Sequence, residues 1–223
     1  DKIKANTYKG EVVKIIGHKN DPGVDILSVI AKYGFSDKFS DEVMKELDDI
    51  PNEIDENDIK NRRDLREEEI FTIDGDDAKD LDDAVSLKIL ENGNYFLGVH
   101  IADVSYYVKE NSEIDKEAFN RATSVYLVDR VLPMLPHKWS NGICSLNGGV
   151  DRFAVSCTME INDKGDVVSY DIFPSVINSK LRMTYKKVNQ VIEENIIPEG
   201  YEPYADKLKL MNELSLIVRK EKN

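Results

Sequence analysis

The chain has 223 residues, enough for one large domain or for one domain with a smaller appendage. Its hydrophobic content of 41% is ordinary for a globular core, and no apolar run is long enough to span a membrane. The net charge of −13 argues against nucleic-acid binding, because affinity for phosphate comes mainly from lysine and arginine.

The chain begins at Asp1 without a signal peptide and ends in a charged helical pattern, so we expect both ends to be cut from a longer protein. Cys144 and Cys157 have neither metal-binding nor disulfide spacing. This predicts a reducing, cytoplasmic location, with Cys157 buried on a strand. The three histidines are far apart, and no zinc-binding set is present.

The first 40 residues predict one strand and one helix. Residues 9–16 alternate as a strand does, and Asp21-Pro22-Gly23 predicts a turn. We expect Asp25 to cap a helix that runs to about Lys32 and ends at Gly34.

The next segment predicts a second helix and a charged connector. Ser40 is the expected cap, and Val43, Met44 and Leu47 would share one helix face. Residues 41–58 carry nine acids and one lysine, which predicts a solvated, partly helical connector.

From Glu69 onward the pattern favours strands. Asn92-Gly93 predicts a type I′ hairpin between strands near 84–91 and 94–101. Ser112 and Asp115 predict a helix that runs to about Arg121.

The last third predicts a second hairpin and two helices. Strands at 153–161 and 167–177 would be joined by the turn Asn162-Asp163-Lys164-Gly165, and helices are expected near 184–194 and 205–221. Antiparallel strands followed by helices predict the α+β class, with a mainly antiparallel sheet and segregated helices.

The segment from Ile73 to Val85 holds six aspartates and a single lysine between two apolar, strand-like runs. An acidic turn is usually just solvated, but carboxylates held together repel one another strongly and call for a cation. An EF-hand loop does not fit, because its sixth position is Lys79 where glycine is needed and its twelfth is Val85 where glutamate is needed. Magnesium, which takes a few carboxylates and phosphate oxygens, fits the pattern better.

Hydrolysis of a phosphodiester needs an activated water, neutralised phosphate oxygens and a stabilised leaving oxygen, and two magnesium ions can supply all three. In an extended segment Asp80 and Asp82 would share one side, and Asp83 would point away unless the turn bends. Spacing alone therefore does not establish which aspartates converge.

Several blocks in a fixed order across residues 66–195 resemble the ribonuclease II/R (RNB) family of exoribonucleases, and the Gly-Asp-Asp-Ala inside the acidic loop is most like its R branch. The blocks are Ile73–Val85, His100–Ser105, Arg121–Tyr126, Leu132–Pro136, Ile143–Asn147 and Leu181–Tyr185.

The resemblance implies a division of the chain into three parts. Residues 1–24 would be the end of a cold-shock domain, a remnant of an OB-type barrel, and 25–65 a helical acidic connector. Residues 66–223 would be the first part of the RNB catalytic domain.

The implied activity is magnesium-dependent 3′→5′ hydrolysis of single-stranded RNA to nucleoside 5′-monophosphates, with manganese as a substitute metal. The family also uses an arginine and an acidic residue from the second half of that domain, so we expect this fragment alone to be nearly inactive. Flanking OB-type domains supply much of the family's grip on RNA, which would offset the negative charge.

The resemblance also implies roles for individual residues. Asp74, Asp80, Asp82 and Asp83 fall on the family's four functional aspartates: Asp74, Asp80 and Asp83 as metal ligands, and Asp82 to orient the reactive end of the RNA or the attacking water. Asp76 and Asp77 lie outside this set and are expected to form the turn.

Tyr126 matches a family tyrosine that packs near the terminal nucleotide, where stacking would tolerate any base. The alternative is a core position beside Val125 and Leu127.

Four further residues have simpler structural readings. We expect His100 to hydrogen-bond to the backbone and Asp103 to cap the following turn. Arg121 and Arg152 could contact phosphate, but surface ion pairs are the expectation.

Two functions of other classes remain open. The chain or its parent could be a non-catalytic RNA-binding or interaction module that retains a metal-binding loop, as in family members that have lost catalytic acids. A calcium-stabilised surface loop is the third alternative.

Overall fold

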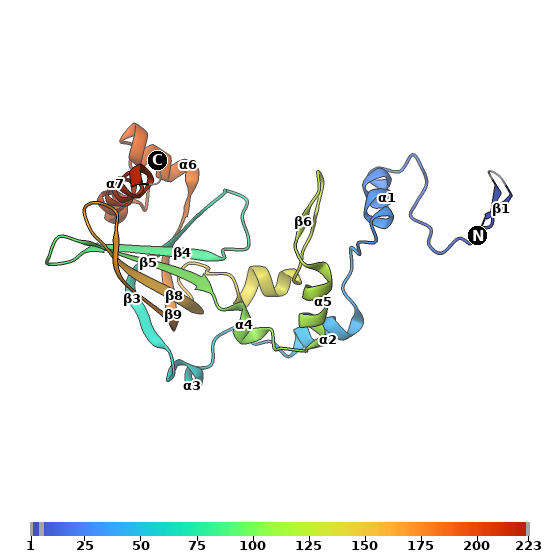
Figure 1. Cartoon of the computed structure of the whole chain (residues 1–223), viewed down its shortest axis with the longest axis horizontal. Coiled ribbons are helices and arrows are strands. Elements are labelled where there is room, and N and C mark those ends of the chain that lie inside the picture. The colour runs from blue at the N-terminus through green and yellow to red at the C-terminus, as the bar shows by residue number, and fades with distance from the viewer. Residues whose placement is uncertain (1, 5–6, 222–223) are drawn as a thin grey trace.

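The main body is a closed barrel of five strands, seen in a computed structural model that describes residues 2–4 and 7–221 (Figure 1). Neighbouring strands pair antiparallel around the barrel, except that β9 closes it by running parallel to β3. The strands, in barrel order, are β3 (Arg63–Asp74), β4 (Asp83–Ile89), β5 (Tyr95–Ala102), β8 (Asp151–Ile161) and β9 (Val167–Thr184).

The expected α+β class, with a mainly antiparallel sheet and segregated helices, is confirmed. The parallel closure was not predicted, and it depends on the length of β9. This strand of 18 residues pairs first with β8 and then, from Ser175 to Thr184, with β3. The predicted strand ended at residue 177, so it lacked most of the segment from Ser175 to Thr184 that pairs with β3.

The β4–β5 hairpin is present, but the prediction of a type I′ turn was wrong. Such a turn needs a positive φ at both Asn92 and Gly93, and only Gly93 has one, at 86°. The Gly93 N–H donates to the Leu90 carbonyl and the Leu90 N–H donates to the Asn94 carbonyl, so the left-handed Gly93 is the next-to-last residue of the five-residue loop 90–94.

Helices at the C-terminal end of the chain cover one side of the barrel (Figure 1). Val188, Val191 and Leu208 pack on Phe71, and Leu214 packs on Leu87 and neighbouring strand residues. The elements are α6 (Tyr185–Asn189), η2 (Gln190–Glu194), η3 (Glu202–Tyr204) and α7 (Ala205–Glu221), close to the expected ranges. None of the helices that the structure describes has the length and hydropathy needed to cross a membrane.

A second, smaller core lies beside the barrel, where Val43, Leu47 and Ile114 pack around Trp139. It is built by α2 (Asp41–Asp48), α4 (Val104–Tyr107), α5 (Glu113–Arg121) and the helical turn η1 (Trp139–Ile143). The short helix α3 (Glu56–Ile59) and the strands β6 (Val125–Tyr126) and β7 (Val131–Leu132) complete this region.

The predicted caps of α2 and α5 are confirmed, because Ser40 Oγ accepts from the Val43 N–H and Ser112 Oγ accepts from the Asp115 N–H. Val43 and Leu47 are buried as expected, whereas Met44 is exposed.

The N-terminal predictions were less accurate. Residues 9–16 form no strand, because no segment of the described chain pairs with them; β1 (Lys2–Lys4) and β2 (Thr7–Tyr8) pair only with each other. Helix α1 (Val24–Lys32) begins after Gly23, and Asp25 lies in its first turn instead of capping it. Gly34 follows the helix with a φ of 74°.

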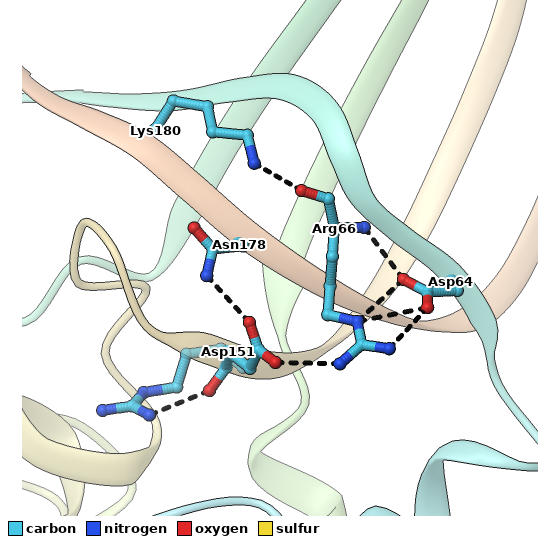
Figure 2. A network of polar contacts seen from close by, with 6 residues as sticks. Asp64, Arg66, Asp151, Asn178 and Lys180 are labelled. Atoms are coloured by element: carbon cyan, nitrogen blue, oxygen red, sulfur yellow. Dashed lines mark hydrogen bonds and ion pairs between the residues drawn. The ribbon is translucent and has the colours of Figure 1, made fainter.

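A polar network fixes an irregularity in β3 (Figure 2). Four residues of β3, 66–69, stand between partners that are separated by one residue on β9. Figure 2 shows the Arg66 guanidinium between the carboxylates of Asp64 and Asp151, at 2.7 and 3.0 Å, while Asn178 and Lys180 of β9 join from the other side. These contacts hold the bulged strand against its neighbours.

Arg62 ties the small core to the barrel. Its guanidinium pairs with Asp103 at 2.6 Å, both side chains being 8% exposed, and lies 4.1 Å from the centre of the Phe153 ring. Asp103 also accepts from Ser105 and from the Tyr106 N–H, so the expectation that it caps the following turn is confirmed.

We predict that Arg62→Ala lowers the free energy of unfolding by about 3–5 kcal/mol, because it leaves the buried Asp103 carboxylate without its charged partner. Urea unfolding followed by circular dichroism measures this. Lys116→Ala is the control, since its pair with Glu113 is exposed and should cost less than about 1 kcal/mol. Equal effects of the two variants would contradict a stabilising role for the buried Arg62–Asp103 ion pair.

Candidate functional site

The acidic segment forms the loop 75–82 at one edge of the barrel, between Asp74, the last residue of β3, and Asp83, the first of β4. Because β3 and β4 are adjacent and antiparallel, the loop returns to the edge from which it left. The parallel partner β9 ends beside Asp74, at Thr184.

The loop is fixed from within by Leu81, which is 1% exposed and belongs to the barrel core with Ile70, Ala84 and Leu146. Its N–H donates to Ser145 Oγ at 3.1 Å, and its carbonyl accepts from the Leu146 N–H at 2.8 Å. The buried Leu81 thus anchors the centre of the loop to the barrel core, between Asp80 and Asp82.

Arg182 of β9 fixes the other half of the loop. Its guanidinium donates to the carbonyls of Asp76 and Ala78 at 3.0 and 2.7 Å and to that of Gly75 at 3.3 Å. These anchors all bind backbone atoms of the loop. The fold is therefore held without using the carboxylates.

The aspartates that the family resemblance selects affect one another's pKa values through their charges. Burial and the charge of Asp83 raise the pKa of Asp74, and Asp80 contributes. Burial, followed by the charges of Asp80, Asp83 and Asp74, raises the pKa of Asp82. Asp74 and Asp82 therefore both lie within electrostatic range of Asp80 and Asp83.

The chemistry of this set fits a hard divalent cation, which takes carboxylate oxygens as ligands and would remove the mutual repulsion. Asp74 Oδ2 is buried and has no hydrogen-bond partner in the described part of the chain. As positioned, however, no three acidic, histidine or cysteine side chains among the described residues could hold a metal ion. The four aspartates thus lie near one another in the chain and in electrostatic range, but they do not form a ligand set as positioned.

A cavity of about 920 Å³ lies against the loop, and Asp80, Asp82 and Tyr126 line it. Asp74 and Asp83 are not among its lining residues. Tyr126 is 72% exposed on β6, so the alternative that placed it in the core is wrong. The remaining wall comes mainly from 131–144, including Pro133, Met134, Leu135 and His137.

Two contacts of the loop were missed in the sequence. Arg182 and Ser145 stand in blocks that resemble the RNB family, but nothing in their spacing shows that they bind the acidic loop. The only signal in the sequence was that the blocks with Arg182 and Ser145 belong to the same ordered set of family-like blocks as the acidic loop.

His100 is buried inside the barrel, and its partners are side chains instead of the backbone that was expected. Nδ1 lies 2.7 Å from Ser156 Oγ and Nε2 lies 3.1 Å from Ser86 Oγ. Burial lowers the pKa of His100 to about 4. The imidazole is therefore neutral in the folded chain at ordinary pH and serves the barrel interior.

Arg121 and Arg152 are not the surface ion pairs that were expected. The Arg121 side chain is 11% exposed, and besides its pair with Glu117 it donates to the carbonyls of Ser36, Lys38 and Pro133. Arg152 is buried and donates to the Ser145 carbonyl at 3.0 Å. Both arginines bind backbone and stabilise the fold.

The cysteines are both free, in agreement with their spacing. Cys144 is buried, and burial raises the pKa of its thiol to about 12. Cys157 lies on β8 as predicted and is half-buried.

Comparison with known families gives two matches, an RNB domain at residues 62–223 and a cold shock domain at residues 2–40. The chain belongs to the RNB family. The nucleases of this family are metal-dependent.

Curated relatives in the family include ribonuclease R of Thermotoga maritima, 51% identical over 213 residues, and ribonuclease R 1 of Lactococcus lactis, 52% identical over 219 residues. These alignments cover 95% and 98% of this chain but 30% and 27% of the relatives. The chain thus spans somewhat under a third of their length.

Solved structures agree with this assignment. Mycoplasma genitalium RNase R in complex with ribose-methylated single-stranded RNA superposes with a TM-score of 0.86 at 31% identity, covering 92% of this chain and 32% of that one. Yeast Ssd1, described as a pseudonuclease, has the same fold, with a TM-score of 0.67 at 18% identity over 86% of this chain and 24% of that one.

We predict that folding stability depends on pH through His100. An unfolded histidine takes up a proton below about pH 6.5, whereas the buried ring resists protonation until about pH 4. The free energy of unfolding should therefore fall as the pH drops through this window, by at most about 3 kcal/mol from this group.

The measurement is an NMR titration of the His100 ring proton in the native chain and in urea. The urea-unfolded ring should titrate near 6.5 and the native ring well below it. A native ring that titrates near 6.5 would contradict its burial between two serine hydroxyls.

Proposed function

We propose that this chain is the acidic-loop part of a 3′→5′ exoribonuclease that hydrolyses single-stranded RNA to nucleoside 5′-monophosphates by a two-metal, magnesium-dependent mechanism. The observation that carries the proposal is the convergence of Asp74, Asp80, Asp82 and Asp83 on one anchored loop, beside a cavity, in a chain of the RNB family. Relatives named ribonuclease R support the reaction class.

In this proposal, Asp74, Asp80 and Asp83 hold magnesium, for which manganese can substitute. The metal would neutralise phosphate oxygens and lower the pKa of the attacking water. Asp82, which faces the cavity, positions the reactive end of the RNA or that water. The backbone contacts of Leu81 and Arg182 hold the loop in place and leave its carboxylates free to rotate and bind the metal.

Tyr126 is proposed to stack on the terminal base. Its ring is exposed and lines the same cavity as Asp80 and Asp82. A stacked base needs no particular hydrogen-bonding edge, so an exonuclease built in this way would accept any RNA sequence.

The division into a cold-shock remnant at 1–24, a connector at 25–65 and a catalytic part at 66–223 is kept as part of the proposal. The family matches support a cold-shock part followed by an RNB part, although the cold-shock match extends to residue 40 and the RNB match begins at residue 62. Free cysteines support a reducing, cytoplasmic location. Because the chain spans under a third of its relatives, we propose that it is nearly inactive by itself.

We predict that manganese binds to this chain in a calorimetric titration and that Asp74→Asn/Asp83→Asn abolishes the binding, since it removes the two expected ligands at the strand ends. The matched control is Asp76→Asn/Asp77→Asn. It removes the same charge from the same loop but leaves the four converging aspartates intact.

Equal losses in the two double variants would mean that only the net charge of the loop attracts the ion. Binding that survives in both would place the metal elsewhere.

In the full-length parent, we predict that Asp82→Asn abolishes hydrolysis of a 5′-labelled RNA oligonucleotide while RNA binding, measured by fluorescence anisotropy, is retained. The change removes one charge beside the reacting end without altering the loop anchors. Turnover at the parental rate would eliminate the proposed role of Asp82.

The alternative is a non-catalytic RNA-binding module that keeps the loop. Its supporting observations are the unfinished ligand set and the occurrence of this fold in a protein described as a pseudonuclease. It predicts that RNA binding in the parent proceeds without any metal-dependent cleavage, and the same labelled-RNA assay separates the two functions.

A further inference from the structure

A second cavity, of about 520 Å³, lies on the small core and has no residue in common with the acidic-loop cavity. We call it the aromatic groove. Its walls come mainly from four parts of the chain: α2, the connector that follows it as far as α3, helix α4, and the start of α5. The lining includes four acidic side chains, three aromatic ones and a single lysine.

The charge on this groove excludes phosphate ligands. Four carboxylates, Glu46, Asp49, Asp55 and Asp58, face a single cation, Lys109. A nucleic acid would be repelled here, whereas a positively charged group would be attracted.

The four acids are not equally available. Glu46 accepts from the N–H groups of Glu113 and Ile114, Asp55 accepts from the Asn57 N–H, and Asp58 accepts from the Tyr106 hydroxyl. Asp49 is exposed on the rim beside Ile50 and Pro51. The first three are thus held in position, and Asp49 supplies a solvent-facing charge.

The wall of the groove holds two polar groups that lack partners. Trp139 is 2% exposed, and neither its indole N–H nor the Tyr107 hydroxyl has a hydrogen-bond partner among the described residues. Buried donors are nearly always satisfied in native proteins, so each of these two groups calls for an acceptor, which a water or a ligand atom can supply. Peptide carbonyls are such acceptors.

The aromatic rings of this region already bind cations of the chain. The Lys109 ammonium lies 4.6 Å from the centre of the Tyr106 ring, and the Arg62 guanidinium lies 5.0 Å from it. Tyr106 is therefore occupied, and an incoming cation would use the carboxylates and the neighbouring Tyr107.

We propose that the aromatic groove binds a basic peptide segment of a partner protein. Its arginine or lysine side chain pairs with Asp49 and the fixed acids, and its backbone carbonyls accept from Trp139 and Tyr107. A volume of about 520 Å³ fits one or two residues of such a segment. This site is independent of the proposed nuclease reaction.

Trp139 is the only tryptophan of the chain, so its fluorescence reports on this groove. We expect the capped peptide acetyl-Gly-Arg-Gly-Arg-Gly-amide to change the emission saturably and in a salt-sensitive manner. The same peptide with citrulline in place of arginine keeps the carbonyls but lacks the charge, and it should bind at least about tenfold more weakly.

Two variants separate the contributions of charge and hydrogen bonding. Asp49→Asn should weaken the arginine peptide about two- to fivefold, whereas Asp163→Asn, in the exposed turn between β8 and β9, should leave it unchanged. Tyr107→Phe keeps the ring and removes the unpartnered hydroxyl, so it should weaken binding about two- to tenfold without lowering the melting temperature.

Four results would overturn the proposal. Equal affinity of the citrulline and arginine peptides would remove the charge recognition. Spermidine binding as tightly as the peptide would assign the groove to small polyamines. A single-stranded RNA oligonucleotide that displaces the peptide would assign it to nucleic acid. The absence of any saturable change would show that the groove is not a binding site for cations.

Discussion

The repulsion among four carboxylates on one short loop is the constraint on which the site depends. On an unanchored loop, this repulsion would drive Asp74, Asp80, Asp82 and Asp83 apart into solvent. The fold prevents this with apolar burial and backbone hydrogen bonds: Leu81 enters the barrel core, Ser145 and Leu146 bind its backbone, and Arg182 binds the other half of the loop. Burial is the main cause of the raised pKa values of Asp74 and Asp82, and the charges of the neighbouring aspartates add to it.

These anchors come from distant parts of the chain, which explains the architecture around the loop. Ser145 precedes β8 and Arg182 lies near the end of β9, so the barrel must close before the loop is fixed. The parallel pairing of β9 with β3 delivers Arg182 to the loop, since Thr72 and Arg182 are register partners two residues before Asp74. The unusual length of β9 is thus a requirement of the site as well as of the barrel.

Local patterns in the sequence predicted the local structure well. The Ser40 and Ser112 caps, the alternation in β8 and the β4–β5 hairpin depend on neighbours in the chain, and each was predicted. The strand at 9–16 failed because alternation cannot say whether a pairing partner exists. The contacts of Arg121 and Arg152 were not predicted for a similar reason: they include distant backbone carbonyls that spacing does not reveal. The same holds for Arg62 and Arg182, for which no expectation came from the sequence.

The binding of these arginines inside the fold affects how charge is distributed over the surface. With these arginines bound internally, both concave surfaces carry more acidic than basic side chains: three aspartates and Lys79 line the acidic-loop cavity, and four carboxylates and Lys109 line the aromatic groove. The segment 137–144 separates the two. His137, Ser140, Asn141 and Cys144 line the cavity at the loop, while Trp139, between them in sequence, lines the groove. Because Trp139 and Ile143 pack in one small core, an occupant that repositioned the indole would have to move the turn that forms the cavity wall. The two surfaces thus share one packed element, and the geometry of each limits that of the other.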